Sequence, residues 1–224
     1  MQSATIPAPG SGISRASPDV AKVFIVDDDI SMRESLELLV RSAGWHSESF
    51  ASAEEFLQRP RASVPSCLVL DYRMPELDGL ALQQRLAADR ACLPIIFITY
   101  FGDPSMAVQA MKAGAIEILT KPFGDDALLG AIQLGIARSH VALRRETQLR
   151  SLQYCYGTLS RREREIMNLV VTGLLNKQIG RELQISEITV KAHRGRVMRK
   201  MHAASLAELV NMAIKLDLES VQER

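Results

Sequence analysis

The sequence predicts an α/β protein: a doubly wound domain of five βα units, followed by a smaller all-α domain. Between residues 23 and 119, short apolar runs alternate with longer amphipathic stretches, which is the pattern of a parallel sheet covered by helices on both faces. Beyond residue 158 every patterned stretch is helical. The length of 224 residues also fits two small domains.

Five strands and five helices are expected in the first domain. The helical patterns fall at about residues 31–43, 53–59, 79–88 and 104–113, and from 125 onward. The strands are predicted at the apolar runs 23–26, 46–50, 67–70, 95–98 and 116–119, of which 46–50 is the weakest. Strands of this kind, separated by helices, favour a parallel sheet.

The chain is expected to divide into four segments. Residues 1–20 are rich in Ser, Ala, Pro and Gly and lack the apolar region of a secretory signal, so we expect a flexible tail. The α/β domain is assigned to residues 21–137 and the all-α domain to 158–224. Between them, residues 138–157 contain no Pro and many helix formers, which predicts a helical linker that continues the fifth helix.

The net charge of +1 conceals two opposite halves. Residues 20–137 contain 10 basic and 16 acidic residues, a net charge of −6. Residues 158–224 contain 12 basic and 8 acidic residues, a net charge of +4, and the linker adds four arginines against Glu146 alone. Such asymmetry indicates that the basic part of the chain interacts with nucleic acid.

Composition also bears on where the protein works. No apolar run approaches the roughly 20 residues that a membrane-spanning helix needs, so we expect no membrane association. The three scattered cysteines, Cys67, Cys92 and Cys155, form neither a CxxC pair nor an even set for disulfides. This pattern favours a reduced, cytoplasmic setting.

Polar side chains follow the predicted strands of the first domain. They are Asp27, Asp28 and Asp29 after the first strand, Asp71 after the third, Thr99 at the end of the fourth and Lys121 after the fifth. In an open parallel sheet, the carboxyl ends of the strands meet at one edge, where ligands bind. Any one of these aspartates alone is more often a turn or helix cap, but together they predict a site.

Clustered carboxylates repel one another unless a cation neutralises them, and hard oxygen ligands suit Mg²⁺ or Mn²⁺. A carboxylate beside such an ion can attack a phosphoryl group and form an aspartyl-phosphate. The Thr99 hydroxyl and the Lys121 ammonium could then donate to the phosphoryl oxygens.

The motifs in this domain resemble those of response-regulator receiver domains. They are Val-Asp-Asp-Asp at 26–29, Leu-Asp-Tyr-Arg-Met-Pro at 70–75, Ile-Thr at 98–99 and Lys-Pro-Phe at 121–123. The resemblance implies a flavodoxin-like (βα)5 fold in which Asp71 is the phosphoacceptor and Thr99 and Lys121 are its switch partners. It also implies a cis peptide before Pro122. The implied Mg²⁺ (or Mn²⁺) ligands are Asp28, Asp71, the backbone carbonyl of Arg73 and, largely through water, Asp27.

Two residues depart from the pattern of the receiver family. Family members usually have Tyr or Phe three residues before the lysine, where this chain has Ile118, and a small residue after the threonine, where it has Tyr100. The first departure puts the aromatic rotamer switch in doubt. We expect Tyr100 to crowd the phosphoryl site and to slow the gain or loss of phosphate.

The all-α domain has the pattern of a helix-turn-helix. Capping boxes are expected at Ser160 with Glu163 and at Ser205 with Glu208, and Ser186 is expected to cap a helix that follows a short one at 177–183. On the helix after Ser186, Val190, Val197 and Met201 share one face at 100° per residue. The opposite arc holds Lys191, Ala192, Gly195, Arg196 and Arg199, a set suited to phosphates and base edges.

The string from Leu159 to Glu165, with Gly173, Asn176 to Ile179 and Ile185 to His193, resembles the LuxR/NarL-type helix-turn-helix. The resemblance implies that Lys191 and Ala192 approach bases and that Lys177, Thr189 and His193 lie near phosphates. We also count Arg196 and Arg199 among the DNA-binding residues. The last helix, at about 205–216, dimerises on DNA in this family, although core packing explains its apolar pattern equally well.

Taken together, these resemblances identify the chain as a two-component transcriptional regulator of the FixJ/NarL type. A sensor histidine kinase would phosphorylate Asp71, and phosphorylation would promote homodimerisation and promoter binding. The partners implied are therefore the kinase, promoter DNA and RNA polymerase, and the expected outcome is activation of transcription rather than enzyme turnover.

Two other interpretations use part of the same residues. A haloacid-dehalogenase-like phosphatase would use Asp27 as its nucleophile with Thr99, Lys121 and the Asp125–Asp126 pair, but it leaves Asp71 and the basic domain without a role. The basic domain also resembles a sigma-factor region, although no promoter-melting domain accompanies it.

Overall fold

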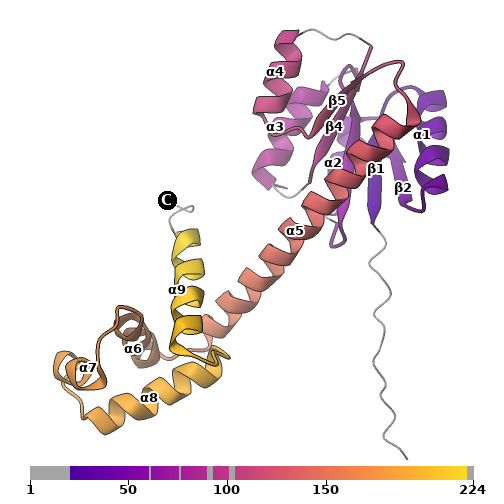
Figure 1. Ribbon diagram of the computed structural model, residues 1–224. Helices are drawn as coiled ribbons and strands as arrows, with labels where there is room; N and C mark the ends of the chain where they lie inside the picture. The colour runs from indigo at the N-terminus through magenta and orange to yellow at the C-terminus, as the bar shows by residue number, and fades with distance from the viewer. Residues whose placement is uncertain (1–20, 61, 76, 90–92, 101–103, 221–224) are drawn as a thin grey trace, which may run out of the picture. The chain divides into compact units, whose positions relative to one another are not determined.

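The computed structural model describes residues 21–60, 62–75, 77–89, 93–100 and 104–220 (Figure 1). The predicted tail at residues 1–20 and Cys92 lie outside the described residues. The chain forms two compact units, one ending at Leu143 and the other beginning at Arg144. Each is described by itself, and the helix α5, Asp125–Gly157, contributes to both.

The first unit is built on a five-stranded parallel sheet in the order β2-β1-β3-β4-β5. The strands are β1 Lys22–Val26, β2 His46–Phe50, β3 Ser66–Asp71, β4 Ile95–Thr99 and β5 Glu117–Thr120. In this order β3 is the central strand and β1 lies beside it. The strand β2 lies on one side of β1, and β3, β4 and β5 follow in turn on its other side. The predicted doubly wound α/β fold is confirmed, and the weak run at 46–50 is a strand.

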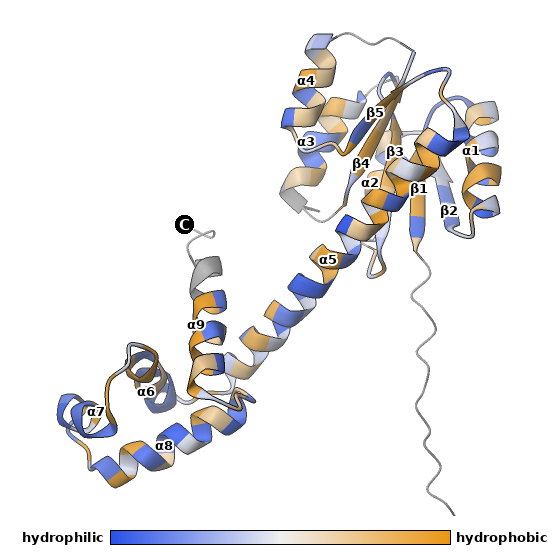
Figure 2. Cartoon of the chain, viewed as in Figure 1, coloured by the Kyte–Doolittle hydropathy of each residue, from blue (hydrophilic) through white to orange (hydrophobic). Residues whose placement is uncertain are grey.

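Helices cover both faces of this sheet. They are α1 Ile30–Ser42, α2 Ala53–Gln58, α3 Gly79–Asp89, α4 Pro104–Lys112 and α5. Alternate residues of β1 face opposite cores: Phe24 belongs to the cluster that includes Phe56 of α2 and Leu82 of α3. Ile25 belongs to the cluster that includes Leu36 of α1 and Leu128 of α5. In Figure 2 the inner strands β1, β3 and β4 are accordingly mostly apolar.

The second unit contains α6 Arg161–Val171, α7 Asn176–Glu182, α8 Glu187–Lys200 and α9 Leu206–Ser220. A separate core unites them, with Ile166 of α6, Ile179 of α7, Val190 of α8 and Leu209 of α9 all buried. The predicted stripe of Val190, Val197 and Met201 is in this core, each side chain no more than 1% exposed. The all-α reading of the second domain is therefore confirmed.

Serine side chains begin three of these helices as the sequence predicts, with one difference. Ser160 and Glu163 form the full capping box of α6, and the Ser186 hydroxyl accepts a hydrogen bond from the backbone N–H of Thr189. Ser205 accepts from the N–H of Glu208, but the Glu208 carboxylate accepts from Ala204 instead of Ser205. The predicted box at Ser205 is thus only half formed, because the Glu208 side chain reaches one residue further back.

Candidate functional site

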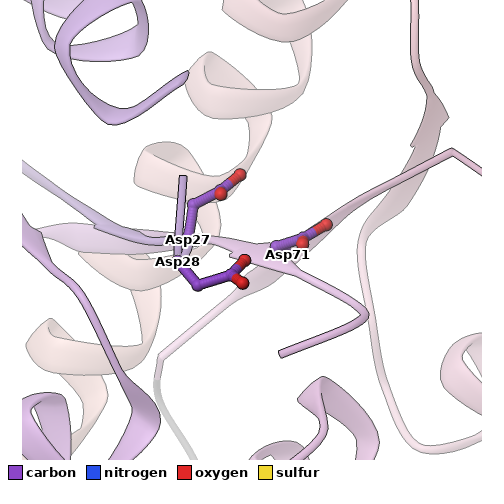
Figure 3. Close-up of side chains that lie close together, drawn as sticks. All are labelled: Asp27, Asp28 and Asp71. Atoms are coloured by element: carbon purple, nitrogen blue, oxygen red, sulfur yellow. The ribbon is translucent and has the colours of Figure 1, made fainter. Parts of the chain in front are cut away.

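Three carboxylates cluster at the carboxyl ends of β1 and β3 (Figure 3). Asp27 follows β1 and is 1% exposed, Asp71 ends β3 and is 6% exposed, and Asp28 is open to solvent. One carboxylate oxygen from each lies within 4.8 Å of the others. A group of oxygen ligands that is buried on one side and open on the other fits Mg²⁺, which keeps part of its water shell.

Lys121 provides the cation that faces this cluster. Its Nζ lies 3.0 Å from Asp27 Oδ2 and 3.4 Å from Asp71 Oδ1, and its side chain is buried. The peptide before Pro122 is cis, as the resemblance implied. Lys121 therefore lies close enough to Asp71 to reach an oxygen of a group attached there.

Burial and neighbouring charges change the pKa of both partners. Burial raises the pKa of Asp71 to about 6; the Lys121 ammonium opposes the rise, and the charge of Asp27 adds to it. Burial by itself lowers the pKa of Lys121, but the hydrogen bond and charge of Asp27 raise it above its usual value overall. Lys121 therefore stays charged at neutral pH, when Asp71 is largely ionised.

Asp29, the third acid of the triplet, has a different role from its neighbours. Its carboxylate caps α1 by accepting from the N–H of Ser31 at 2.8 Å, and its own N–H donates to Asp27 Oδ1 at 2.9 Å. Arg33, which the sequence did not single out, donates to the backbone carbonyl of Asp27 at 2.7 Å. These contacts help to orient the Asp27 side chain toward Lys121. The contribution of Arg33 was not predicted, because no sequence motif includes it.

Thr99 and Tyr100 complete the edge of the sheet beside Lys121. Thr99 is 1% exposed at the end of β4, and its carbonyl accepts from the Lys121 N–H at 2.7 Å. Tyr100 is 62% exposed, and its ring centroid lies 4.8 Å from Lys121 Nζ. The aromatic ring therefore stands beside the ammonium that faces Asp71.

The other two residues that the sequence singled out lie nearby in the chain. Ile118, in β5, packs against the core cluster on the α2–α4 side of the sheet. Arg73 lies two residues beyond Asp71, in the loop that follows β3. The use of its carbonyl as a metal ligand stays a prediction.

In the second unit, α8 turns one face to the core and the opposite face to solvent. Lys191, Ala192, Gly195, Arg196 and Arg199 are all exposed, as predicted, and so is Lys177 of α7. Thr189 and His193 are half-buried. The Thr189 hydroxyl lies 2.8 Å from the Ser186 hydroxyl, and His193 Nδ1 has no hydrogen-bond partner among the described residues. Six of the eight residues predicted to lie on or near the DNA-binding face are therefore exposed to solvent.

Two basic residues of α8 hold the domain together instead. Arg194 donates to Asn176 Oδ1 of α7 at 3.2 Å. Lys200 donates to Glu163 Oε2 at 2.6 Å and to the Thr158 carbonyl at 3.0 Å, which ties the end of α8 to the capped start of α6. Charge alone could not separate these two residues from Arg196 and Arg199, because the distinction depends on which acceptors the other helices bring.

Arg196 and Arg199 line a cavity of about 530 Å³ within the second unit, together with Tyr154, Lys200 and His202. The two arginine side chains give this cavity a positive charge, which suits an anionic group such as a nucleic-acid phosphate.

Comparison with known proteins gives a match for the first unit and another for the second. Residues 23–133 match the family described as response regulator receiver domain, and residues 157–213 match the bacterial regulatory proteins of the luxR family. The chain is 46% identical to Nodulation protein W of Bradyrhizobium diazoefficiens over 211 residues. The aligned region covers 94% of this chain and 93% of that protein. The chain belongs to the FixJ/LuxR family of response regulators.

Two further comparisons support the same family assignment for this response regulator. The transcriptional regulatory protein FixJ of Bradyrhizobium diazoefficiens is 40% identical over 193 residues, which is 86% of this chain and 94% of FixJ. The solved structure of the response regulator StyR has a TM-score of 0.78 and 47% identity, covering 88% of this chain and 99% of that one.

The family establishes what this response regulator does in general terms. It is a DNA-binding transcription regulator of a two-component system. A receiver domain implies a sensor histidine kinase as partner, and a luxR-type domain implies promoter DNA. Among the described residues, none of the helices combines the length and apolar character needed to cross a bilayer.

Proposed function

We propose that Asp71 is the phosphoacceptor of this response regulator. The observation that carries the proposal is the position of its carboxylate, which is largely buried at the end of β3 and faces both the Lys121 ammonium and two further carboxylates. An Asp71 oxygen attacks the phosphorus of the kinase phosphohistidine; the O–P bond forms as the N–P bond breaks, and the histidine keeps the electron pair.

The surrounding side chains each have a part in this transfer. Asp28, Asp71 and the Arg73 carbonyl, with Asp27 through water, would hold Mg²⁺, which would neutralise charge on the phosphoryl oxygens. Asp27 keeps Lys121 oriented and charged through their 3.0 Å contact. The Lys121 ammonium and the Thr99 hydroxyl then donate to oxygens of the new phosphoryl group.

Phosphorylation adds a charge of roughly −2 to a unit that is already acidic. As Thr99 moves toward the phosphoryl group, the face formed by α4 and β5 reorganises and pairs with a second copy of the chain. The exposed apolar side chains Val108 and Met111 of α4 support this choice of face. The homodimer would place two α8 helices in major grooves one helical turn apart and recruit RNA polymerase.

The substitution Asp71→Asn tests the proposal. In the presence of Mg²⁺ and acetyl phosphate, the wild-type protein should acquire one phosphoryl group, shift to a dimer in analytical ultracentrifugation and gain promoter affinity. The Asp71→Asn protein should do none of these, whereas Glu34→Gln, which removes an exposed carboxylate of α1, should behave as wild type.

The same experiment separates the phosphatase interpretation from the regulator. A phosphatase that uses Asp27 would release phosphate from small esters catalytically, and Asp71→Asn would leave that turnover intact. Stoichiometric labelling that is lost in Asp71→Asn supports the phosphoacceptor, and labelling that persists in this variant contradicts it.

A further inference from the structure

Ile188 lies in the first turn of α8 with 82% of its side chain exposed. This is the largest exposed fraction among the large hydrophobic side chains that the structure describes as exposed. The side chain is absent from the core of the second unit, which includes Val190 and Val197 of the same helix. Ile188 therefore contributes little buried surface to folding.

Helical geometry places Ile188 at the middle of the face that α8 turns to solvent. Successive residues of an α-helix are separated by about 100°, so Gly195 and Arg199 lie within about 20° of Ile188 around the helix axis. By the same rule Ala192 and Lys191 lie about 40° and 60° away on either side. The buried Val190 and Val197 fall within about 20° of the opposite direction, so this geometry agrees with the observed burial.

An exposed isoleucine in this position has no local structural reason. β-Branched residues are weaker helix formers than Ala, and the cap of α8 comes from Ser186. The neighbours of Ile188 on the exposed face are basic or small, which is the composition of a surface that meets DNA.

We infer that Ile188 contacts the C5-methyl group of a thymine in the major groove and so selects T at one position of each half-site. In a helix-turn-helix, the N-terminal residues of the second helix reach the base edges, and Ile188 is the second residue of α8. The thymine methyl is the apolar group that the major groove presents. This inference rests on the proposal that the exposed face of α8 binds DNA.

The test uses the full-length protein with acetyl phosphate and Mg²⁺. Duplexes are first selected from a random pool by the wild-type protein, and each thymine of the selected sequence is then replaced by uracil, which lacks only the methyl group. At one position in each half-site, uracil should lower wild-type affinity about fourfold, the factor that corresponds to roughly 0.8 kcal/mol for one buried methyl-sized group. Ile188→Ala should show no such penalty.

Two further variants distinguish the possible failures. Leu38→Ala removes a comparably exposed aliphatic side chain on α1 and should keep the wild-type penalty. If Ile188→Ala also keeps it, Ile188 does not contact the methyl group and the inference is wrong, even when Lys191→Ala abolishes sequence-specific binding. If Lys191→Ala leaves binding unchanged as well, the proposed DNA-binding face of α8 fails together with the inference.

Discussion

When no cation is bound, burial makes the charged form of the Asp71 carboxylate less favourable in the folded protein than in the unfolded chain. Burial raises its pKa from the ordinary 3.8 to about 6, so the folded protein binds a proton more tightly than the unfolded chain does between these values. The free energy of unfolding should therefore fall as the pH rises from about 4 to about 6, because ionisation costs more in the folded state.

The substitution Asp71→Asn should relieve this cost. In Mg²⁺-free buffer at pH 7, we expect the receiver unit to gain about 1–2 kcal/mol in the free energy of unfolding, after allowance for the lost contact with Lys121. Urea unfolding at pH 4 and pH 7 measures the change, which should shrink at the lower pH. The exposed Asp126→Asn serves as control, and a gain that is equal at both pH values would contradict the explanation.

Tyr100 is one of the two residues, with Ile118, at which this receiver departs from the usual pattern of its family. Its ring centroid lies 4.8 Å from Lys121 Nζ, beside the ammonium that faces Asp71, so we expect the ring to crowd a phosphodonor or water at this site. A cation–π contact at an exposed site contributes about 0.5–1 kcal/mol, so removing the ring should change rates by about two- to fivefold.

We expect Tyr100→Ala to accelerate phosphorylation by acetyl phosphate and to shorten the lifetime of the aspartyl-phosphate by this factor. Tyr100→Phe, which keeps the ring, should remain close to wild type in both measurements. Unchanged rates in Tyr100→Ala would show that the ring does not crowd the site.

At the level of elements, the turn between α7 and α8 depends on a close approach of backbone. A Cβ added to Gly180 of α7 would lie 2.8 Å from the carbonyl oxygen of Ile185, whereas nothing lies within 4 Å of one added to Gly195 in α8. The Ile185 N–H also donates to the Gly180 carbonyl at 2.9 Å, so the turn cannot move away without losing this hydrogen bond.

These two glycines make a matched pair for a stability measurement. Gly180→Ala should lower the free energy of unfolding of the second unit by about 1–3 kcal/mol through overpacking. Gly195→Ala should raise it by up to about 1 kcal/mol, because alanine is the better helix former. Thermal unfolding followed by circular dichroism gives both values, and equal effects of the two substitutions would contradict this account of the turn.

At the level of the whole molecule, the net charge of +1 is a cancellation between an acidic receiver and a basic reader of DNA. Affinity for DNA should therefore fall steeply with salt despite the neutral total, because the local phosphate contacts release counterions. The exposed Lys177 and Arg199 are two of the residues proposed to make these contacts.

Replacing either of them by Ala should reduce the slope of log affinity against log salt concentration by about 0.9. Fluorescence anisotropy with a selected duplex over a range of salt concentrations measures the slope. Arg85→Ala, which removes an exposed charge from α3 of the receiver, should leave it unchanged. Ile188→Ala should also preserve the slope while altering the base preference, since a methyl contact releases no counterion.

Much of this protein could be read from its sequence, because hydrophobic periodicity and strand-end residues are local signals. The alternation of apolar runs and helices determined the α/β fold, and the acids and the lysine that follow the strands of a parallel sheet had to meet at one edge. The face of α8 that avoids the core followed from helical spacing alone. The caps at Ser160 and Ser186 followed from serines placed just before the predicted helices.

Other features were decided only by tertiary packing. Which basic residues of α8 remain available for DNA depended on the acceptors that α6 and α7 bring to Lys200 and Arg194. The separate use of Asp29 as a helix cap, and the contact of Arg33 with the Asp27 carbonyl, depended on how α1 starts beside β1. Hydrophobic periodicity predicts which face of a helix or strand is buried. It does not predict which residues of other elements pack against or bond to that element, because those contacts join residues far apart in the sequence.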